Sequence, residues 1–129
     1  VEQESANEGE RPMIAGMYLN RLHQGMKLQA DPTVKYALHD FALRRIMINH
    51  LSVNSPYNTY RNVGLPIGPI CIPSLNAIQS VLNYAHHNYI YMCAKEDFSG
   101  THNFVATYEE HTANAKRYAE ALNKRGIAK

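Results

Sequence analysis

The sequence predicts a mostly helical α+β fold, formed by a single domain of 129 residues. Three observations support this class. Apolar residues recur at helical spacing in several segments. Two short apolar runs, at residues 89–94 and 102–106, have the length of paired strands. Residues 51–73 follow neither pattern, because prolines and glycines interrupt them, and their embedded tyrosines predict a long irregular segment that is ordered.

Helices are predicted along the first third of the chain. Residues 1–8 have helical character and end at Gly9. Pro12 then opens a second helix, since a proline at the first helical position loses no hydrogen bond. Asp31 precedes a proline and is expected to cap a short helix over residues 32–38. The buried face of the second helix is predicted to consist of Ile14, Met17, Tyr18, Leu22 and Met26.

The remaining elements follow local signals of the same kind. Residues 44–48 predict a short strand, and Ser74 is expected to cap a third helix. The runs at residues 89–94 and 102–106 are predicted to pair as a hairpin. Residues 107–110 form a capping box that opens a last helix. The buried face of the third helix is predicted to contain Leu75, Ile78 and Leu82.

Composition argues against several classes of function. The net charge is +2, and the basic residues are scattered, whereas a nucleic-acid-binding domain carries a clustered basic stripe. No apolar run approaches the roughly 20 residues that a membrane span requires. The two cysteines, Cys71 and Cys93, do not make a disulfide framework and leave the cellular compartment open. We therefore predict no binding to nucleic acid.

Acidic residues cluster at the start of the chain, and composition alone would make them a solvated surface. On a helix, Glu2 and Glu4 would point to different faces, whereas Glu4 and Glu8 could share one. Burial of Glu4 with Glu8 nearby would raise the pKa of the Glu4 carboxyl. A carboxylic acid that stays protonated near neutral pH is what cleavage of a glycosidic bond needs.

A second candidate region is the block from Ser55 to Tyr60, which packs two aromatic rings, an amide and a hydroxyl into four residues. Such a set can stack on a sugar ring and bind its hydroxyl groups. Equally, the tyrosines could pin the loop to the core while the polar groups satisfy the loop's own backbone. The residues by themselves leave both interpretations open.

Metal and cofactor chemistry receives no support from the motifs. The histidines lack the spacing of a metal-ligating motif, and no phosphate-binding glycine loop or nucleophile elbow is present. We therefore predict no metal site and no cofactor.

Several blocks occur together and in a fixed order over nearly the whole chain. They are residues 2–5, 10–12, 20–22, 28–34, 55–60, 64–70, 89–94, 102–104 and 107–111. In this combination the chain resembles the catalytic domain of the MltG-type (YceG-like) endolytic murein transglycosylase family. The resemblance implies a lysozyme-like catalytic cleft in one domain over residues 1–129.

The resemblance also implies an activity. The family cleaves the β-1,4 bond between N-acetylmuramic acid and N-acetylglucosamine in nascent peptidoglycan and leaves a 1,6-anhydromuramic end, which terminates the glycan strand. Its catalytic glutamate is the second one of a Glu-Lys-Glu-Thr motif, which corresponds to Glu4 here. Gln3 stands in place of the lysine and Ser5 in place of the threonine.

The residues expected to bind substrate are polar or aromatic groups that no helix or strand requires. We predict that most of them line one groove with Glu4, and that Ser5 also helps to hold the Glu4 carboxyl. The predicted contacts are Ser5, Gln29, Asp31, Tyr57, Asn58, Thr59, Tyr60, His102 and Phe104.

The resemblance further implies a location. Family members are single-pass proteins of the bacterial cytoplasmic membrane whose catalytic domain faces the cell wall, preceded by a small upstream domain. Val1 is not an initiator methionine, so we expect that upstream sequence has been removed. Peptidoglycan glycan strands are the expected substrate, and cell-wall synthases are expected partners.

Two other functions remain open at this point. A muramidase would hydrolyse the same bond with a second carboxylate, for which Asp31 is the candidate. A peptidoglycan-binding module would keep the cleft without cleaving. A transglycosylase needs only one carboxyl group, because the C6 hydroxyl of the substrate itself attacks the anomeric carbon.

Overall fold

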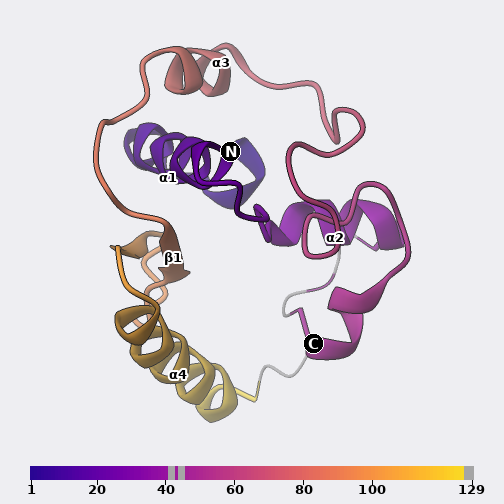
Figure 1. Ribbon diagram of the computed structural model, residues 1–129. Helices are drawn as coiled ribbons and strands as arrows, with labels where there is room; N and C mark the ends of the chain where they lie inside the picture. The colour runs from indigo at the N-terminus through magenta and orange to yellow at the C-terminus, as the bar shows by residue number, and fades with distance from the viewer. Residues whose placement is uncertain (41–42, 44–45, 127–129) are drawn as a thin grey trace. The chain divides into compact units, whose positions relative to one another are not determined.

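Four α-helices and one two-stranded antiparallel sheet form the regular structure of the computed structural model, which describes residues 1–40, 43 and 46–126 (Figure 1). The predicted α+β class is confirmed, whereas the lysozyme-like cleft stays a prediction. Three short 3₁₀ turns complete the elements. In chain order these are η1 (Glu2–Glu4), η2 (Glu8–Glu10), α1 (Arg11–His23), α2 (Asp31–Leu38), η3 (Ile48–Ser52), α3 (Leu75–Leu82), β1 (Tyr91–Ala94), β2 (His102–Val105) and α4 (Tyr108–Lys124).

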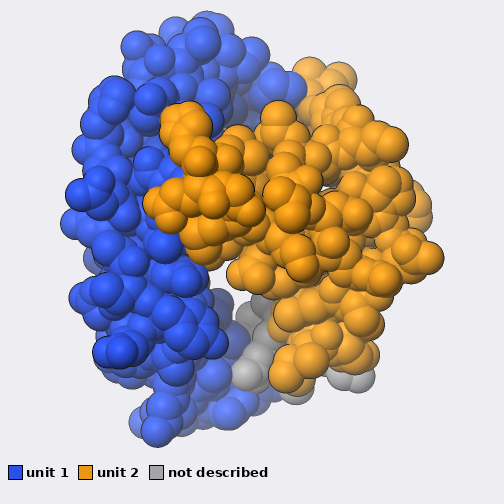
Figure 2. Space-filling model, viewed as in Figure 1, with its two compact units in different colours: residues 1–20, 73–127 blue, residues 21–72, 128–129 orange. Residues whose placement is uncertain are grey.

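The described residues divide into two compact units, which Figure 2 distinguishes by colour. Unit 1 is discontinuous in sequence and contains, among the described residues, 1–20 and 73–126. Unit 2 contains residues 21–72. The assignment of residues 1–129 to one catalytic domain stays a prediction.

The predicted helix over residues 1–8 is wrong. Two 3₁₀ turns, η1 and η2, stand in its place, and Ser5 between them is extended, with φ −150° and ψ 133°. The Ser5 hydroxyl accepts a hydrogen bond from the Asn7 backbone N–H at 3.1 Å. This local bond offers the backbone an alternative to the helix. Helical spacing between Glu4 and Glu8 is therefore absent, and the argument that they share one face does not apply.

Helix α1 confirms the second predicted helix. Ile14 and Met17 are buried, while Tyr18, Leu22 and Met26 are only partly covered.

In α3, the predicted cap is confirmed but the predicted buried face is wrong. The Ser74 hydroxyl accepts a hydrogen bond from the Ala77 N–H at 3.2 Å. Ala77 and Ser80 are buried, whereas the three apolar residues that were predicted to be buried are exposed. The buried face is the one that carries Asn76, whose amide oxygen accepts a hydrogen bond from Arg11. A buried guanidinium group needs such polar partners, and small side chains let the helix approach it. The exposed residues are Leu75, Ile78 and Leu82.

The predicted hairpin and last helix are confirmed. β1 and β2 pair in antiparallel register, with Met92 opposite Phe104. The Thr107 hydroxyl accepts from the Glu110 N–H at 3.3 Å and donates to the Glu110 carboxylate at 2.8 Å, which fixes the start of α4. α4 packs on the hairpin, where the rings of Tyr91 and His111 stack at a centroid distance of 5.0 Å.

Unit 2 contains α2 and most of the long irregular segment. α2 matches the prediction, but Asp31 is its first residue and not its cap; Ala30 precedes it and makes no side-chain cap. Of the strand predicted at residues 44–48, residues 44 and 45 lie outside the described part of the chain. Residues 46 and 47 belong to no strand, and Ile48 begins η3. Residues 53–73 contain neither helix nor strand, as predicted.

Gly16 lies where the segment after α3 crosses α1. A Cβ atom at this position would lie 2.2 Å from the Ala85 carbonyl oxygen and 2.8 Å from Nε2 of His87. The crossing segment is held there, since the Ala85 N–H donates to the Pro12 carbonyl at 3.0 Å.

We predict that Gly16→Ala lowers the free energy of unfolding by about 1–3 kcal/mol, because overpacking forces the backbone apart. Urea unfolding followed by circular dichroism measures this change. Gly9→Ala is the matched control, since its Cβ would meet nothing closer than 3.4 Å. The idea fails if both variants unfold at the same urea concentration as the parent.

Candidate functional site

Glu4 ends η1 and is partly buried. The hydroxyl of Tyr18, on α1, donates a hydrogen bond to Oε1 of Glu4 at 2.8 Å. This bond fixes the direction of the carboxyl group. From the sequence, Tyr18 is predicted only to lie on the buried face of a helix, because a contact across 14 residues leaves no local signal.

Ser5 is buried beside Glu4, and four residues bind its polar groups. Its hydroxyl donates to Oε2 of Glu10 at 3.0 Å, with the Gly100 carbonyl at 3.4 Å. The same oxygen accepts from Asn7, and the Ser5 carbonyl accepts from Nε of Arg11 at 3.0 Å. The hydroxyl group is therefore bound to Glu10, and the expected role of Ser5 in holding the Glu4 carboxyl stays a prediction.

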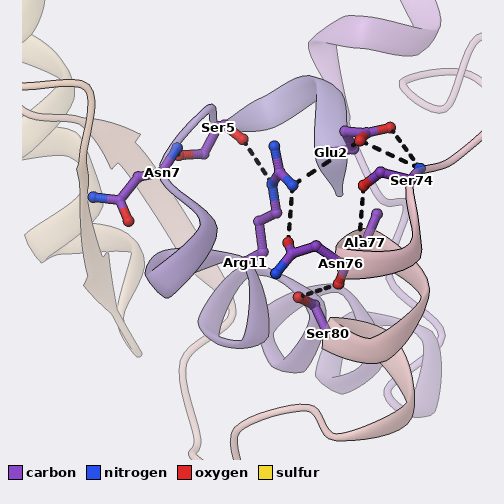
Figure 3. Close-up of polar contacts among 8 residues, drawn as sticks. All are labelled: Glu2, Ser5, Asn7, Arg11, Ser74, Asn76, Ala77 and Ser80. Carbon is purple, nitrogen blue, oxygen red and sulfur yellow. Dashed lines mark hydrogen bonds and ion pairs between the residues drawn. The ribbon is translucent and has the colours of Figure 1, made fainter.

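Arg11 joins the chain around Glu4 to α3 (Figure 3). Its Nη1 donates to the Asn76 side chain at 2.8 Å and lies 4.0 Å from the Glu2 carboxylate. Glu2 also accepts from the Ser74 N–H at 3.2 Å, and its hydrogen bonds with Ser74 lower the pKa of the Glu2 carboxyl. Both ends of η1 are thus attached, so the backbone that carries Glu4 has a defined position.

His102 and Phe104 lie on β2. The Glu10 carboxylate accepts from the His102 backbone N–H at 2.5 Å and lies 2.9 Å from Nδ1 of the ring. The Phe104 ring lies 6.3 Å from that of His102 and 6.3 Å from that of Tyr89, as centroid distances. Among the predicted contacts, the structure brings Ser5 and His102 together, since both bind the same carboxylate.

In unit 2, Asp31 is bound by Tyr60. The Tyr60 hydroxyl donates to Oδ1 of Asp31 at 2.5 Å. Burial raises the pKa of the Asp31 carboxyl, against the smaller effects of the Tyr60 hydrogen bond and of Lys35, which lower it. The structure therefore joins two predicted contact residues that lie 29 positions apart.

Asn58 and Thr59 are the most deeply buried of the predicted contacts, with exposed fractions of 0% and 1%. The Asn58 amide donates to the carbonyls of Leu51 and Val53 at 2.9 and 2.8 Å, and its oxygen accepts from the Tyr60 N–H. Of the two interpretations left open for this loop, these bonds favour the one in which polar groups satisfy the backbone.

Thr59 has the same kind of environment. Its hydroxyl oxygen accepts from the Ala30 N–H at 2.8 Å and lies 2.9 Å from the Thr33 hydroxyl. Asn58 and Thr59 therefore position the loop and its tyrosines.

The two remaining predicted contacts of unit 2 are Gln29 and Tyr57. Gln29 is exposed and adopts a left-handed backbone conformation, with φ +50°; its N–H donates to the Thr59 carbonyl at 3.3 Å. The Tyr57 ring packs against that of Tyr36 at a centroid distance of 4.7 Å. The prediction that these residues share one groove with Glu4 stays a prediction.

Within the described residues, no three His, Cys, Asp or Glu side chains are grouped so that they could hold a metal ion. Over the same part of the chain, no helix has both the length and the apolar character needed to cross a membrane.

Comparison with known proteins decides the family. The family model described as the YceG-like family matches residues 1–117. The chain belongs to this family. The YceG-like chain is 34% identical over 125 residues to an endolytic murein transglycosylase of Bacillus subtilis strain 168, which covers 97% of the chain and 34% of that protein.

A second curated relative and a crystal structure support the same family. An endolytic murein transglycosylase of Streptococcus pneumoniae serotype 2 is 33% identical over 125 residues, covering 94% of this chain and 22% of that protein. A crystal structure of a YceG-like protein from Listeria monocytogenes matches with a TM-score of 0.80 and 39% identity, over 87% of this chain and 36% of that one. The YceG-like chain thus spans only 34% and 22% of the lengths of these two curated relatives.

We predict that Asn58→Ala destabilises the protein by at least about 2 kcal/mol, because each buried polar group left without a partner costs about 1–3 kcal/mol. Chemical denaturation measures the loss. Asn62→Ala is the control, since that side chain also donates to two carbonyls, at 3.0 Å each, but is exposed. Equal losses in the two variants would contradict the assigned role of Asn58.

Asp31 predicts a pH dependence of stability. Because its pKa is raised in the folded state, the unfolded chain loses this proton first as the pH rises. The folded state then holds more protons, so the free energy of unfolding falls with increasing pH from about pH 4. Asparagine does not titrate, so the Asp31→Asn variant does not undergo this loss of stability. Its free energy of unfolding relative to that of the parent should therefore increase over the same pH range.

Urea unfolding of both proteins between about pH 3 and pH 7 provides the measurement. Asp97→Asn is the control of opposite sign, because hydrogen bonds from Ser99 lower the pKa of Asp97. That variant should lose stability relative to the parent as the pH rises. A pH-independent difference for Asp31→Asn would rule out this account.

Proposed function

We propose that this chain carries the catalytic activity of an endolytic lytic transglycosylase, which cleaves the N-acetylmuramic acid–N-acetylglucosamine β-1,4 bond of nascent peptidoglycan. The observation that carries the proposal is the Glu4 carboxyl, which is held by Tyr18 at 2.8 Å and which the family resemblance makes the expected catalytic glutamate. The alignment of nearly the whole chain with proteins named endolytic murein transglycosylases supports it.

In the proposed mechanism, Glu4 acts first as a general acid. It donates its proton to the glycosidic oxygen as the bond from that oxygen to the anomeric carbon breaks. The resulting carboxylate then accepts the proton of the C6 hydroxyl, while the C6 oxygen bonds to the anomeric carbon. The product is a 1,6-anhydromuramic end, and Glu4 regains its acid form. Attack within one sugar ring is effectively unimolecular, so no enzyme nucleophile or activated water is needed.

The neighbours of Glu4 fit this role. The carboxyl group must reach the glycosidic oxygen in the first step and the C6 hydroxyl in the second, and the Tyr18 hydroxyl restricts its rotation between them. The bonds that hold Ser5 and Glu2 keep the backbone on both sides of Glu4 in place.

We also propose substrate contacts in unit 2 for Gln29, Asp31, Tyr57 and Tyr60, since Asn58 and Thr59 are occupied within the loop. Tyrosine rings offer an apolar face to a sugar and a hydroxyl to its polar groups. His102 and Phe104 are proposed contacts from unit 1. The carboxylate of Asp31 already accepts the Tyr60 hydroxyl, which favours a binding role over that of a second catalytic carboxylate.

For the intact protein we propose a location in the bacterial cytoplasmic membrane, with this segment on the side of the cell wall and glycan strands as substrate. Nascent strands are made at that surface, so cell-wall synthases are the proposed partners.

We predict that Glu4→Gln lowers the rate of strand cleavage by on the order of 10²–10⁴-fold, because an amide cannot donate a carboxylic proton while its shape is nearly the same. The measurement uses the intact protein and purified glycan strands, with the new ends identified by mass spectrometry. The expected product of the parent is the anhydro end.

Glu8→Gln is the control, because Glu8 lies on the next turn and is exposed. Glu2 is less suitable, since it binds Ser74. Full activity in Glu4→Gln would show that another residue is the acid. Reducing ends in the parent digest would identify a muramidase instead, and binding without new ends would identify a non-catalytic module.

A further inference from the structure

Glu10 belongs to a block that resembles the family, yet it has no part in the proposed mechanism. Its side chain is only 9% exposed, and its carboxylate faces three potential donors. Oε1 accepts the His102 backbone N–H at 2.5 Å, and Oε2 lies 3.0 Å from the Ser5 hydroxyl and 2.9 Å from Nδ1 of His102. A buried carboxylate surrounded in this way is held in one orientation.

One side of Glu10 controls the chain at Glu4. Ser5 directly follows Glu4, and its Cα lies about 3.8 Å away across one peptide bond. With the Ser5 side chain bound by Glu10 and its carbonyl bound by Arg11, the backbone leaving Glu4 has little freedom to rotate. A change at Glu10 therefore changes where the Glu4 carboxyl points, although Glu10 touches no reacting atom.

The other side of Glu10 controls the ring of His102. A carboxylate can only accept hydrogen bonds, so the ring nitrogen that faces it must carry a proton. In neutral His102 this proton sits on Nδ1, and Nε2 is then a hydrogen-bond acceptor. Neutral histidine in water prefers the opposite tautomer, so the carboxylate selects the less common form. An acceptor at Nε2 suits a hydroxyl group of a sugar.

We propose that Glu10 is a positioning residue, which fixes the direction of Glu4 through Ser5 and selects the Nδ1–H tautomer of His102. The catalytic part of this proposal rests on the proposed function, whereas the tautomer part does not. Glu8 provides the contrast, because it lies on the same 3₁₀ turn but is exposed.

The substitution Glu10→Gln tests both parts of the proposal, because it keeps the shape of the side chain but turns one acceptor into a donor. If the amide oxygen keeps the His102 backbone N–H, the NH₂ group faces Nδ1, which must then accept. The reverse orientation would set the NH₂ group against the backbone N–H. We therefore expect the His102 ring to change to the Nε2–H tautomer.

The experiment combines two readouts on the intact protein. Long-range ¹H–¹⁵N correlation spectra of ¹⁵N-histidine-labelled protein at neutral pH report the tautomer of His102. Strand-cleavage kinetics report kcat and KM separately. For Glu10→Gln we expect the Nε2–H tautomer and a fall in kcat of about 10²-fold, as for a misplaced catalytic group. KM should rise as well, because Nε2 then no longer accepts a hydrogen bond from a sugar hydroxyl. Glu8→Gln should match the parent in both readouts.

Ser5→Ala removes the hydrogen bond from the Ser5 hydroxyl to Glu10 and leaves the contacts between Glu10 and His102. It also tests the positioning part of the proposal if Glu10→Gln does not fold. It should lower kcat while His102 keeps the Nδ1–H tautomer. An Nδ1–H ring in Glu10→Gln overturns the tautomer part, and an unchanged kcat in Glu10→Gln or Ser5→Ala overturns the positioning part. If the parent itself yields no anhydro ends, the proposed function fails, and the spectra still decide whether Glu10 selects the tautomer.

Discussion

Satisfying the buried polar groups around Ser5 is the constraint on which the arrangement of unit 1 depends. An extended residue between two 3₁₀ turns cannot pair its backbone within a helix, so its polar groups must find partners elsewhere. Arg11 supplies a donor for the carbonyl, and Glu10 and Asn7 bind the hydroxyl. Because Arg11 also reaches Asn76, the same interactions decide which face α3 turns inward.

Much of the fold could be predicted because its signals are local. Proline near the first helical position of α1, serine before α3 and the Thr107–Glu110 pair at α4 each act within one turn of the chain, and each marks the correct boundary. The same reasoning wrongly predicted a helix at the start of the chain. Glutamates favour a helix, but the Ser5 hydroxyl accepts a hydrogen bond from the backbone N–H two residues later. The face of α3 was also out of reach, because hydrophobic spacing carries no information about a buried arginine on another helix.

In the candidate site, too, some residues could be predicted from the sequence and others could not. Glu4 could be chosen because it falls in a recognisable motif, and the resemblance itself is confirmed by the family match. Tyr18 and Glu10 could not, since their partners lie 14 and up to 92 positions away. In the loop of unit 2, the side chains that looked suited to a sugar are of two kinds. Asn58 and Thr59 hold the loop together, and Tyr60 pairs with Asp31, a distinction that only burial and partner geometry reveal.

The discontinuity of unit 1 has a consequence for how the chain folds. Its first 20 residues can complete their contacts only with residues beyond position 73, and the bond between Glu10 and His102 closes a loop of 92 residues. Closing so long a loop carries an entropic cost that local helices avoid, and such distant contacts slow folding. During synthesis, which starts at the N-terminus, residues 1–20 leave the ribosome well before the hairpin that completes their unit. Residues 21–72, by contrast, are contiguous in the sequence. The segment that bears Glu4 is therefore made well before the residues that complete its native contacts.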